Sequence, residues 1–155
     1  MIKDPFSDAE KALAEKGEFS NMTTGMSMMP MLRSGRDIVV IKPPSFPLSK
    51  YDVPLYRRDG LDKLVLHRII KKPQNGIYYI RGDNTYYLEE VRQEDIVGVL
   101  DGFFRDGRYH NCKTDKKYRL YSHLRTADYP IRNFWKSYLR PALGKIKRAL
   151  TGKAK

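Results

Sequence analysis

The sequence has few of the features that mark secreted or membrane-spanning proteins. Its 155 residues include a single cysteine, Cys112, which excludes an internal disulfide framework. No run approaches the roughly 18 consecutive apolar residues that a transmembrane helix needs, and residues 1–19 lack the apolar stretch of a secretory signal. We therefore expect a cytoplasmic protein, which could still lie peripherally at a membrane surface.

Acidic residues are absent from one end of the chain. The whole sequence has 30 lysines and arginines against 18 aspartates and glutamates, a formal net charge of +12. From Tyr129 to Lys155 there are eight basic residues and no acidic one, so this segment alone carries +8. The remaining residues carry only +4. Any electrostatic argument about partners therefore concerns this C-terminal segment.

The chain also lacks internal repeats and low-complexity stretches, and its middle part consists of short apolar segments. Three of these are typical of β-strands and lie at 37–42, 63–71 and 96–104. Asn75-Gly76 is a favoured hairpin turn, and Pro54 predicts that the short strand around it lies at a sheet edge. Residues 19–109 are therefore predicted to form a mostly-β domain.

A helix is expected on each side of this domain. Ser7 with Glu10 fits a capping box, so residues 7–17 predict a short helix within an N-terminal unit at 1–18. The C-terminal tail, residues 129–155, has apolar residues at three- and four-residue steps, which predicts an amphipathic helix.

Two features of the C-terminal part qualify this picture. Pro141 should kink the tail helix or divide it, because proline lacks the backbone N–H that a helix interior uses. Residues 110–128 carry no strong pattern and are expected only to connect the β domain to the tail.

Two interpretations of the tail stay open. Its apolar stripe could lie on an anionic membrane surface, where aromatic side chains insert and basic ones meet the lipid headgroups. Alternatively, the stripe could pack on the β domain and leave the charges solvated. Nucleic acid is a weaker candidate partner, because the charge would suffice for nonspecific binding but no recognition helix or aromatic strand accompanies it. The residues assigned to a membrane contact are Phe134, Trp135, Lys136, Arg140, Lys145, Lys147 and Arg148.

Three stretches of the β domain contain residue types that together could perform acyl transfer. Ser27 follows Gly25 in TGMSMMP and could act as a nucleophile, with backbone N–H groups near both residues facing a developing oxyanion. His67 interrupts an apolar strand, and imidazole chemistry suits a general base. Asp83, which follows Gly82 at a strand end, could orient an imidazole or support the site structurally. Taken singly, a surface loop, a satisfied strand histidine and a Gly-Asp-Asn turn would explain these stretches.

Taken in order, the stretches resemble the signal peptidase I superfamily, which includes the self-cleaving repressor peptidases. SMMPML is similar to its nucleophile segment, VLHRII to the segment that holds the general base, and RGDN to its GDN segment. Histidine in place of the lysine of many bacterial members is similar to the endoplasmic-reticulum, archaeal and spore-former branch. The resemblance runs from about Thr23 to about Phe104, a little over half of the chain.

This resemblance implies a coiled β half-barrel with a cleft at one edge, and a serine endopeptidase that cuts an extended peptide through an acyl-enzyme. Ser27 would be the nucleophile and His67 the base. Asp83 would be the acidic partner, with Glu89 as the alternative acid. The implied partner is a signal- or leader-peptide-like precursor with a small residue before the cut bond.

A second function stays open, and no metal or cofactor is expected. The same β domain with its basic tail could be a non-catalytic peptide- or nucleic-acid-binding module that has kept Ser27 and His67. His110, Cys112 and His123 could be imagined as metal ligands, but their spacing matches no zinc pattern and a fourth ligand is not apparent.

Overall fold

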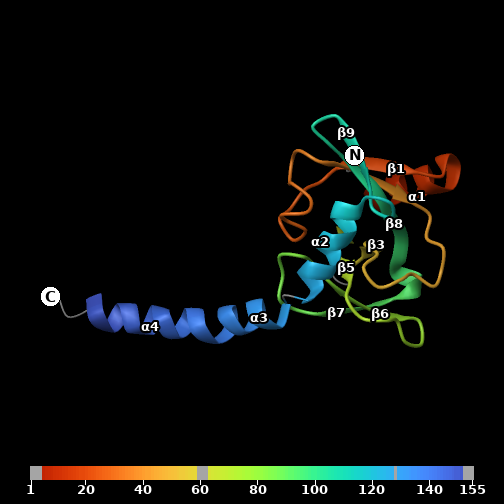
Figure 1. The fold of residues 1–155 in the computed structure, drawn as a ribbon. Coiled ribbons are helices and arrows are strands. Elements are labelled where there is room, and N and C mark those ends of the chain that lie inside the picture. The colour runs from red at the N-terminus through yellow and green to blue at the C-terminus, as the bar shows by residue number, and fades with distance from the viewer. Residues whose placement is uncertain (1–4, 59–62, 128, 152–155) are drawn as a thin grey trace.

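The structure, a computed structural model, describes residues 5–58, 63–127 and 129–151. Within these ranges nothing is described of the side chains at positions 5–7, 132, 133, 136, 137, 146, 147 and 149–151. The chain forms a mostly-β body with a curled half-barrel sheet and a few short helices, and one helical segment extends away from this body (Figure 1). The mostly-β class that the strand patterns predict is confirmed.

A short helix, a series of short strands and a helical C-terminal part follow one another along the described residues. In chain order the elements are α1 (Pro5–Lys16), β1 (Phe19–Met22), β2 (Ile38–Lys42), β3 (Pro54–Arg57), β4 (Leu64–Leu66), β5 (Arg68–Ile69), β6 (Ile77–Arg81), β7 (Glu89–Arg92), the 3-10 turn η1 (Gln93–Asp95), β8 (Ile96–Arg105), β9 (Arg108–Asn111), α2 (Lys116–Ala127), α3 (Tyr129–Phe134), the π-helical turn η2 (Trp135–Leu139) and α4 (Arg140–Thr151). The larger antiparallel sheet has the strand order β1-β2-β8-β3-β4, with β9 beside β8, and the smaller one has the order β5-β6-β7.

The larger sheet curls around β8, its longest strand. Register shifts interrupt the pairing of β8 with β2, between Val40 and Ile41, and with β3, between Leu55 and Tyr56. Such irregularities bend a strand and increase its local twist. The curl brings β1 and β4, the first and last strands of this order, to one pocket, since residues of both strands line it.

Two apolar clusters hold the body together. The first joins α1 to the larger sheet and contains Leu13, Ile41 and Phe103. The second joins the two sheets and contains Tyr56 and Ile80. Each fully buried large apolar side chain contributes about 1.5–3 kcal/mol relative to an exposed one, so these clusters fix the positions of the strands that carry the site.

Two local predictions are corrected. Pro54 pairs with Val99, and β3 lies between β8 and β4, not at a sheet edge. Proline is accepted there because it is the first residue of the strand. Among the described residues the N-terminal helix covers Pro5–Lys16, so it already includes the two residues before the predicted start at Ser7. It ends as predicted at Gly17, which has a φ of 70°.

The strand predicted at 63–71 is divided between the two sheets. β4 belongs to the larger sheet and β5 to the smaller one, and His67 lies between them. The histidine therefore marks the point where the chain crosses from one sheet to the other. The predicted turn at Asn75-Gly76 is confirmed, since both residues have positive φ and β6 follows directly.

The segment predicted only as a connector, 110–128, contains the end of β9 and the helix α2. This helix packs on the body through two tyrosines and a set of hydrogen bonds. Tyr118 and Tyr121 pack in the first apolar cluster. The buried Tyr118 and Ser122 both accept a hydrogen bond from the guanidinium of Arg68. Because polar side chains make much of this contact, no aliphatic stripe in the sequence marks it.

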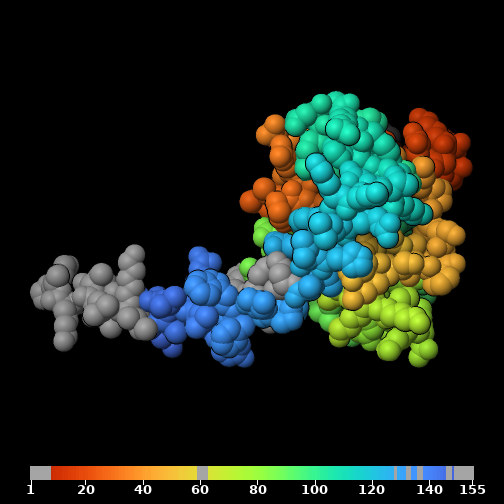
Figure 2. All heavy atoms as spheres, viewed as in Figure 1, coloured from red at the N-terminus to blue at the C-terminus, as the bar shows by residue number. Residues whose placement is uncertain are grey.

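The tail helix, formed by α3, η2 and α4, extends clear of the body (Figure 2). Pro141 does not divide it. Instead, the backbone widens into the π turn directly before the proline, where the N–H of Arg140 donates to the carbonyl of Trp135. A proline lacks its own N–H and crowds the carbonyl four residues back, and a wider turn relieves both problems. None of the described helices is both long enough and apolar enough to span a bilayer.

Candidate active site

Ser27 lies in the long loop between β1 and β2, whose base is closed by hydrogen bonds. The N–H of Thr23 donates to the carbonyl of Asp37 at 2.9 Å, and the N–H of Gly35 donates to the carbonyl of Thr23 at 2.7 Å. The Asp37 carboxylate also pairs with Arg105. Burial raises the pKa of Asp37, but its arginine and backbone partners outweigh this effect and lower the pKa overall. The charged carboxylate therefore holds the loop in place.

The three sequence stretches meet at Gly82. A Cβ added to this glycine would lie 2.8 Å from the carbonyl oxygen of Ser27 and 3.0 Å from Nε2 of His67. Only a residue without a Cβ allows the segments to approach so closely. Asn84 holds Ser27 from the same side, because its N–H donates to the Ser27 carbonyl at 2.7 Å and its side-chain amide donates to the Met26 carbonyl at 3.2 Å.

His67 is 1% exposed, and its Nδ1 faces a tyrosine and a glutamate. Nδ1 lies 3.0 Å from the hydroxyl oxygen of Tyr56 and 2.8 Å from Oε1 of Glu89. The second contact lacks the alignment of a hydrogen bond, whereas Tyr56 donates its proton to Oε2 of Glu89 at 3.0 Å. Since a phenol has one proton, Nδ1 must donate in the bond with Tyr56. Nε2, the nitrogen beside Gly82, is then unprotonated.

The surroundings of His67 favour its neutral form. Burial lowers the pKa of His67 below the usual 6.5, and the Glu89 carboxylate opposes this only in part. Arg58 adds to the lowering. Its Nε lies 3.0 Å from Oε2 of Glu89, and its guanidinium stacks over the ring of Tyr87. A neutral imidazole with a free Nε2 is the form that a general base needs at neutral pH.

Of the two acids predicted for the site, Glu89 is the one beside His67. Asp83 forms a two-pronged ion pair with the buried Arg68, in which both N···O distances are 2.8 Å. Tyr121 of α2 donates to the same carboxylate at 3.0 Å. The sequence leaves Asp83 two roles, either to orient the imidazole or to support the site structurally. These contacts fit structural support, because they attach α2 to the segment after β6, in which Asn84 binds the Ser27 carbonyl.

Ser27 and His67 line one pocket of about 570 Å³. The apolar part of its lining includes Met28, Leu32, Val39, Ile41 and Leu55. Arg58 and Lys63 add two cations, and no carboxylate belongs to the lining among the described residues. No hydrogen bond joins the Ser27 hydroxyl to His67 in the described part of the chain. Such bonds are commonly long in a free enzyme and tighten when substrate binds.

The backbone N–H of Ser27, a residue that lines the same pocket, has no acceptor among the described residues. Gly25, which also lines it, has a φ of 83°, a conformation that residues with a Cβ rarely adopt. The N–H of Ser27 donates no hydrogen bond within residues 5–58, 63–127 and 129–151. This N–H is therefore available to a ligand oxygen, as the predicted oxyanion hole requires.

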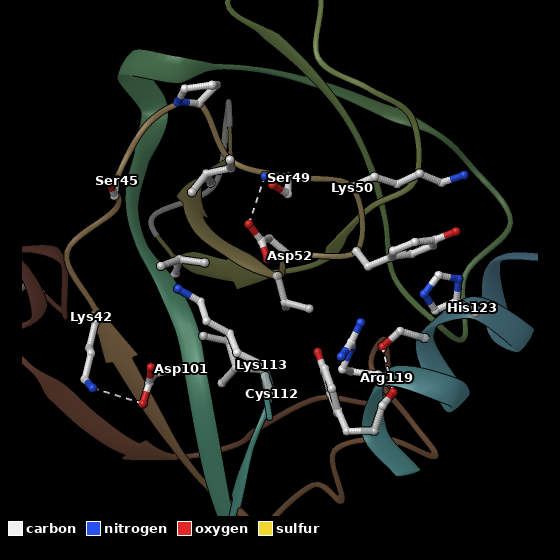
Figure 3. A pocket seen from close by; sticks show the side chains of 18 of the residues that line it. Lys42, Ser45, Ser49, Lys50, Asp52, Asp101, Cys112, Lys113, Arg119 and His123 are labelled. Atoms are coloured by element: carbon white, nitrogen blue, oxygen red, sulfur yellow. Dashed lines mark hydrogen bonds and ion pairs between the residues drawn. The ribbon is translucent and has the colours of Figure 1, made fainter. Parts of the chain in front are cut away.

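A second pocket, of about 600 Å³, also contains serines and a histidine but does not join them (Figure 3). The carboxylate of Asp52 accepts the backbone N–H of Ser49 at 2.9 Å. The ring of His123 contacts that of Tyr51, with centroids 4.2 Å apart and planes tilted by 47°. Among the described residues no hydrogen bond or ion pair connects His123 to a serine or a carboxylate. The pocket that contains Ser27 is therefore the candidate active site.

The residues considered as metal ligands lie in separate contacts. His110 pairs with Asp115 at 3.0 Å. Cys112 is partly buried, and burial raises the pKa of its thiol to about 12. Across the described ranges, no group of three or more histidine, cysteine, aspartate or glutamate residues is arranged to hold a metal ion.

Tyr56, Arg58 and Arg68 contribute to the site but are not among the residues that the sequence predicts. Tyr56 lies in an apolar strand, where an aromatic residue is typical of core packing. Arg58 and Arg68 are two of 30 basic residues. Only the position of Arg68 within an apolar strand could have drawn attention to it, because a charge there must find a buried partner.

No known protein family, curated protein or solved structure matches the chain. Its chemistry is therefore inferred from its own residues, namely a serine on a clamped loop, a buried neutral histidine and the glycine at which the two come together.

Proposed function

We propose that the chain is a serine endopeptidase whose body is a coiled half-barrel of the signal peptidase type. Ser27 is the nucleophile, His67 the general base and Glu89 the acid that holds His67 in place. The observation that carries this proposal is the close approach at Gly82, where a single Cβ would touch both Ser27 and His67. The neutral state of His67 and the polar contacts behind its ring support the same assignment.

Each step of acyl transfer has a group in place. Nε2 of His67 takes the proton of the Ser27 hydroxyl as its oxygen attacks the carbonyl carbon of the peptide. The imidazolium that forms has the Glu89 carboxylate 2.8 Å from its Nδ1. The oxyanion accepts the N–H of Ser27, and one such donor lowers the barrier by about 3 kcal/mol.

The second half of the reaction reverses the roles. His67 gives its proton from Nε2 to the leaving amine, and the first product departs. A water molecule then loses a proton to Nε2 of His67 and attacks the carbonyl carbon of the Ser27 ester. The bond to the Ser27 oxygen breaks, the second product leaves as an acid, and His67 returns its proton to that oxygen.

The pocket fits an extended peptide. It is lined by β1 and β4, the strands at the two ends of the order β1-β2-β8-β3-β4. An extended peptide adds to such an end strand through main-chain hydrogen bonds, while pockets below select its side chains. The apolar lining would accept a small or aliphatic side chain next to the cut bond. A signal- or leader-peptide-like precursor has this character.

Cleavage of a peptide library, read by mass spectrometry, tests the proposal. The wild-type chain should cut extended peptides and the Ser27→Ala variant should not, and the intact mass of both proteins reports self-cleavage. Ser49→Ala is the matched control, because the Ser49 hydroxyl makes no hydrogen bond in the described part of the chain and lies in the other pocket. Cuts that persist unchanged in Ser27→Ala would overturn the assignment of the nucleophile.

The same experiment separates a peptidase from a peptide-binding module. The absence of a bond between the Ser27 hydroxyl and His67 in the described residues gives the second function its support. If wild type and Ser27→Ala bind the same peptides equally and neither cuts them, the pocket is a binding cleft.

A further inference from the structure

The tail helix presents large apolar side chains that no described part of the structure covers. Ile131, Phe134, Trp135, Tyr138 and Leu143 are between 52% and 75% exposed. Figures 1 and 2 show the helix extending away from the body. The interpretation in which the stripe packs on the β domain is therefore wrong for these side chains.

The π turn keeps the exposed side chains on one side of the helix. Ile131, Trp135 and Tyr138 follow at three- and four-residue steps, which is one face of an α-helix. Leu143 comes eight residues after Trp135 and would turn away from this face in a plain α-helix. The π turn between these two residues holds one residue more than an α turn. Leu143 therefore lies relative to Trp135 where a residue seven positions later would lie in a plain α-helix, which is the same face. The stripe therefore continues past Pro141.

The apolar surface also continues onto the body. α2 buries Tyr118 and Ser122 against the sheets but leaves Leu120 and Leu124 about 60% exposed, at 61% and 59%. Leu124 and Ile131 line the same shallow hollow at the junction of α2 and α3. An exposed apolar band thus runs from α2 along the tail helix, and large bands of this kind mark interaction surfaces.

The charge beside this band is of one sign. Arg140, Lys145 and Arg148 are exposed on α4, and the segment from Tyr129 to Lys155 contains no acidic residue. The side chains of Lys136 and Lys147, which the sequence also assigns to a membrane contact, lie outside the described residues. The partner must accept apolar side chains and supply negative charge.

We propose that the tail helix, together with the exposed face of α2, docks on the surface of a bilayer that contains anionic lipids. Acyl chains accept the aromatic and aliphatic side chains, and the lipid phosphates pair with the basic ones. This proposal goes beyond the peptidase function and does not depend on the serine chemistry.

Two other occupants fit the surface less well. A nucleic acid would neutralise the charge but would leave Trp135, Ile131 and Leu143 exposed to water, because its outer surface is phosphate and sugar. A second copy of the chain would bring two tails of +8 together without an acidic residue in either to offset the repulsion.

Trp135 is the single tryptophan of the chain and provides a direct probe. The full-length protein is titrated with vesicles of phosphatidylcholine alone and with vesicles of phosphatidylcholine and phosphatidylglycerol in equal parts, while tryptophan emission is recorded. The expected result is a saturable blue shift with the anionic vesicles only, weakened by salt. Ser27→Ala should bind these vesicles like the wild type, which separates this test from that of the peptidase.

Matched charge variants locate the contact. Arg140→Gln/Arg148→Gln should raise the lipid concentration at half-saturation about 30-fold, from about 1 kcal/mol for each lost cation. Arg92→Gln/Arg108→Gln removes the same charge from exposed positions of the body and should leave binding unchanged. Equal weakening by both pairs would mean that net charge alone drives binding, and would overturn the proposal.

Three further outcomes would also overturn it. One is the absence of a shift with anionic vesicles. Another is a shift with a DNA duplex of equal phosphate concentration but not with vesicles, which would make the tail a nucleic-acid-binding helix. The third is a shift that depends on protein concentration without vesicles, which would show that a second copy covers the band.

Discussion

The hydroxyl of Tyr56 contacts both His67 and Glu89, the proposed base and acid of the candidate site. It donates to Oε2 of Glu89 at 3.0 Å, and its oxygen lies 3.0 Å from Nδ1 of His67. In a simple triad the acid bonds to the histidine directly. Here the carboxylate fixes the direction of the phenol proton, and the phenol in turn requires Nδ1 to donate. Tyr56 is thereby a positioning residue for the Nε2 lone pair.

Tyr56→Phe should reduce kcat/KM about tenfold to a hundredfold, the effect of losing a buried hydrogen bond worth about 1–3 kcal/mol. The ring still fills its place in the core, so the fold should persist. Tyr78→Phe is the matched control, because it removes a buried hydroxyl that accepts the Leu48 N–H and that makes no hydrogen bond to His67 in the described part of the chain. Both variants should lose similar stability in urea unfolding, and only Tyr56→Phe should change the ring-nitrogen NMR shifts of His67. Equal rates for the two variants would refute the positioning role.

The pH dependence of cleavage should follow the pKa of His67. Burial lowers this pKa below 6.5, so the acid limb of kcat/KM should lie below pH 6.5. Glu89 raises the pKa of His67 and Arg58 lowers it. Glu89→Gln should therefore move the limb to lower pH, and Arg58→Gln should move it to higher pH.

An NMR titration of the His67 ring should give the same order of pKa values without any substrate. The ring of His110, which pairs with Asp115 elsewhere on the surface, serves as the internal control. A reversed order in the two variants would mean that Glu89 and Arg58 do not act on His67 through their charges.

Gly82→Ala should separate Ser27 from His67. The new Cβ would lie 2.8 Å from the Ser27 carbonyl oxygen and 3.0 Å from the His67 ring, so one of them must move. We expect loss of cleavage and a destabilisation of about 1–3 kcal/mol from overpacking. Gly144→Ala is the control, because nothing lies within 4 Å of its added Cβ, and in a helix it should stabilise by up to about 1 kcal/mol. If Gly82→Ala cleaved peptides like the wild type, the close approach at Gly82 would not matter for cleavage, and the peptidase proposal would lose its main support.

Asp83→Asn should mainly reduce the stability of the fold, whereas Glu89→Gln should mainly reduce cleavage activity. Asp83→Asn leaves the buried charge of Arg68 without its partner, which should cost about 3–5 kcal/mol of stability. It should also speed amide exchange in α2, because Arg68 and Asp83 hold that helix. Compared with Asp83→Asn, Glu89→Gln should lose less stability in urea unfolding and more activity in peptide cleavage. If Asp83→Asn instead spared stability and stopped cleavage, Asp83 would be the catalytic acid.

Local patterns predicted much of the fold because they depend on neighbouring residues only. The strands around Val40 and Leu100 and the turn at Asn75-Gly76 formed where apolar runs and turn chemistry placed them. The break at His67 was not predictable, because it is set by where the partner strands of two different sheets end. The docking of α2 was also hidden, since it depends on hydrogen bonds to one buried arginine.

The candidate site shows the same division. Motifs predicted Ser27 and His67, and both line one pocket. The motif ranked Asp83 ahead of Glu89 as the acidic partner of His67. In the structure, however, Glu89 lies beside His67 and Asp83 pairs with Arg68. Arg68 pairs in register with Arg81, which brings it next to Asp83 and engages that carboxylate. Glu89 is then the acid left for His67, and no pattern in the sequence shows which carboxylate an arginine will take.

Tyr129, the first residue of the tail helix, contacts the body directly. Ala127 ends α2, and α3 begins at Tyr129. The hydroxyl of Tyr129 donates to the Tyr86 carbonyl at 2.8 Å, and its ring lies 3.6 Å from the guanidinium of Arg81. These two contacts attach the start of the tail helix to β6, which contains Arg81, and to the segment after it, which contains Tyr86. If the tail helix docks on a membrane as proposed, the same contacts would constrain the orientation of the body, and with it the opening of the candidate site, relative to the bilayer.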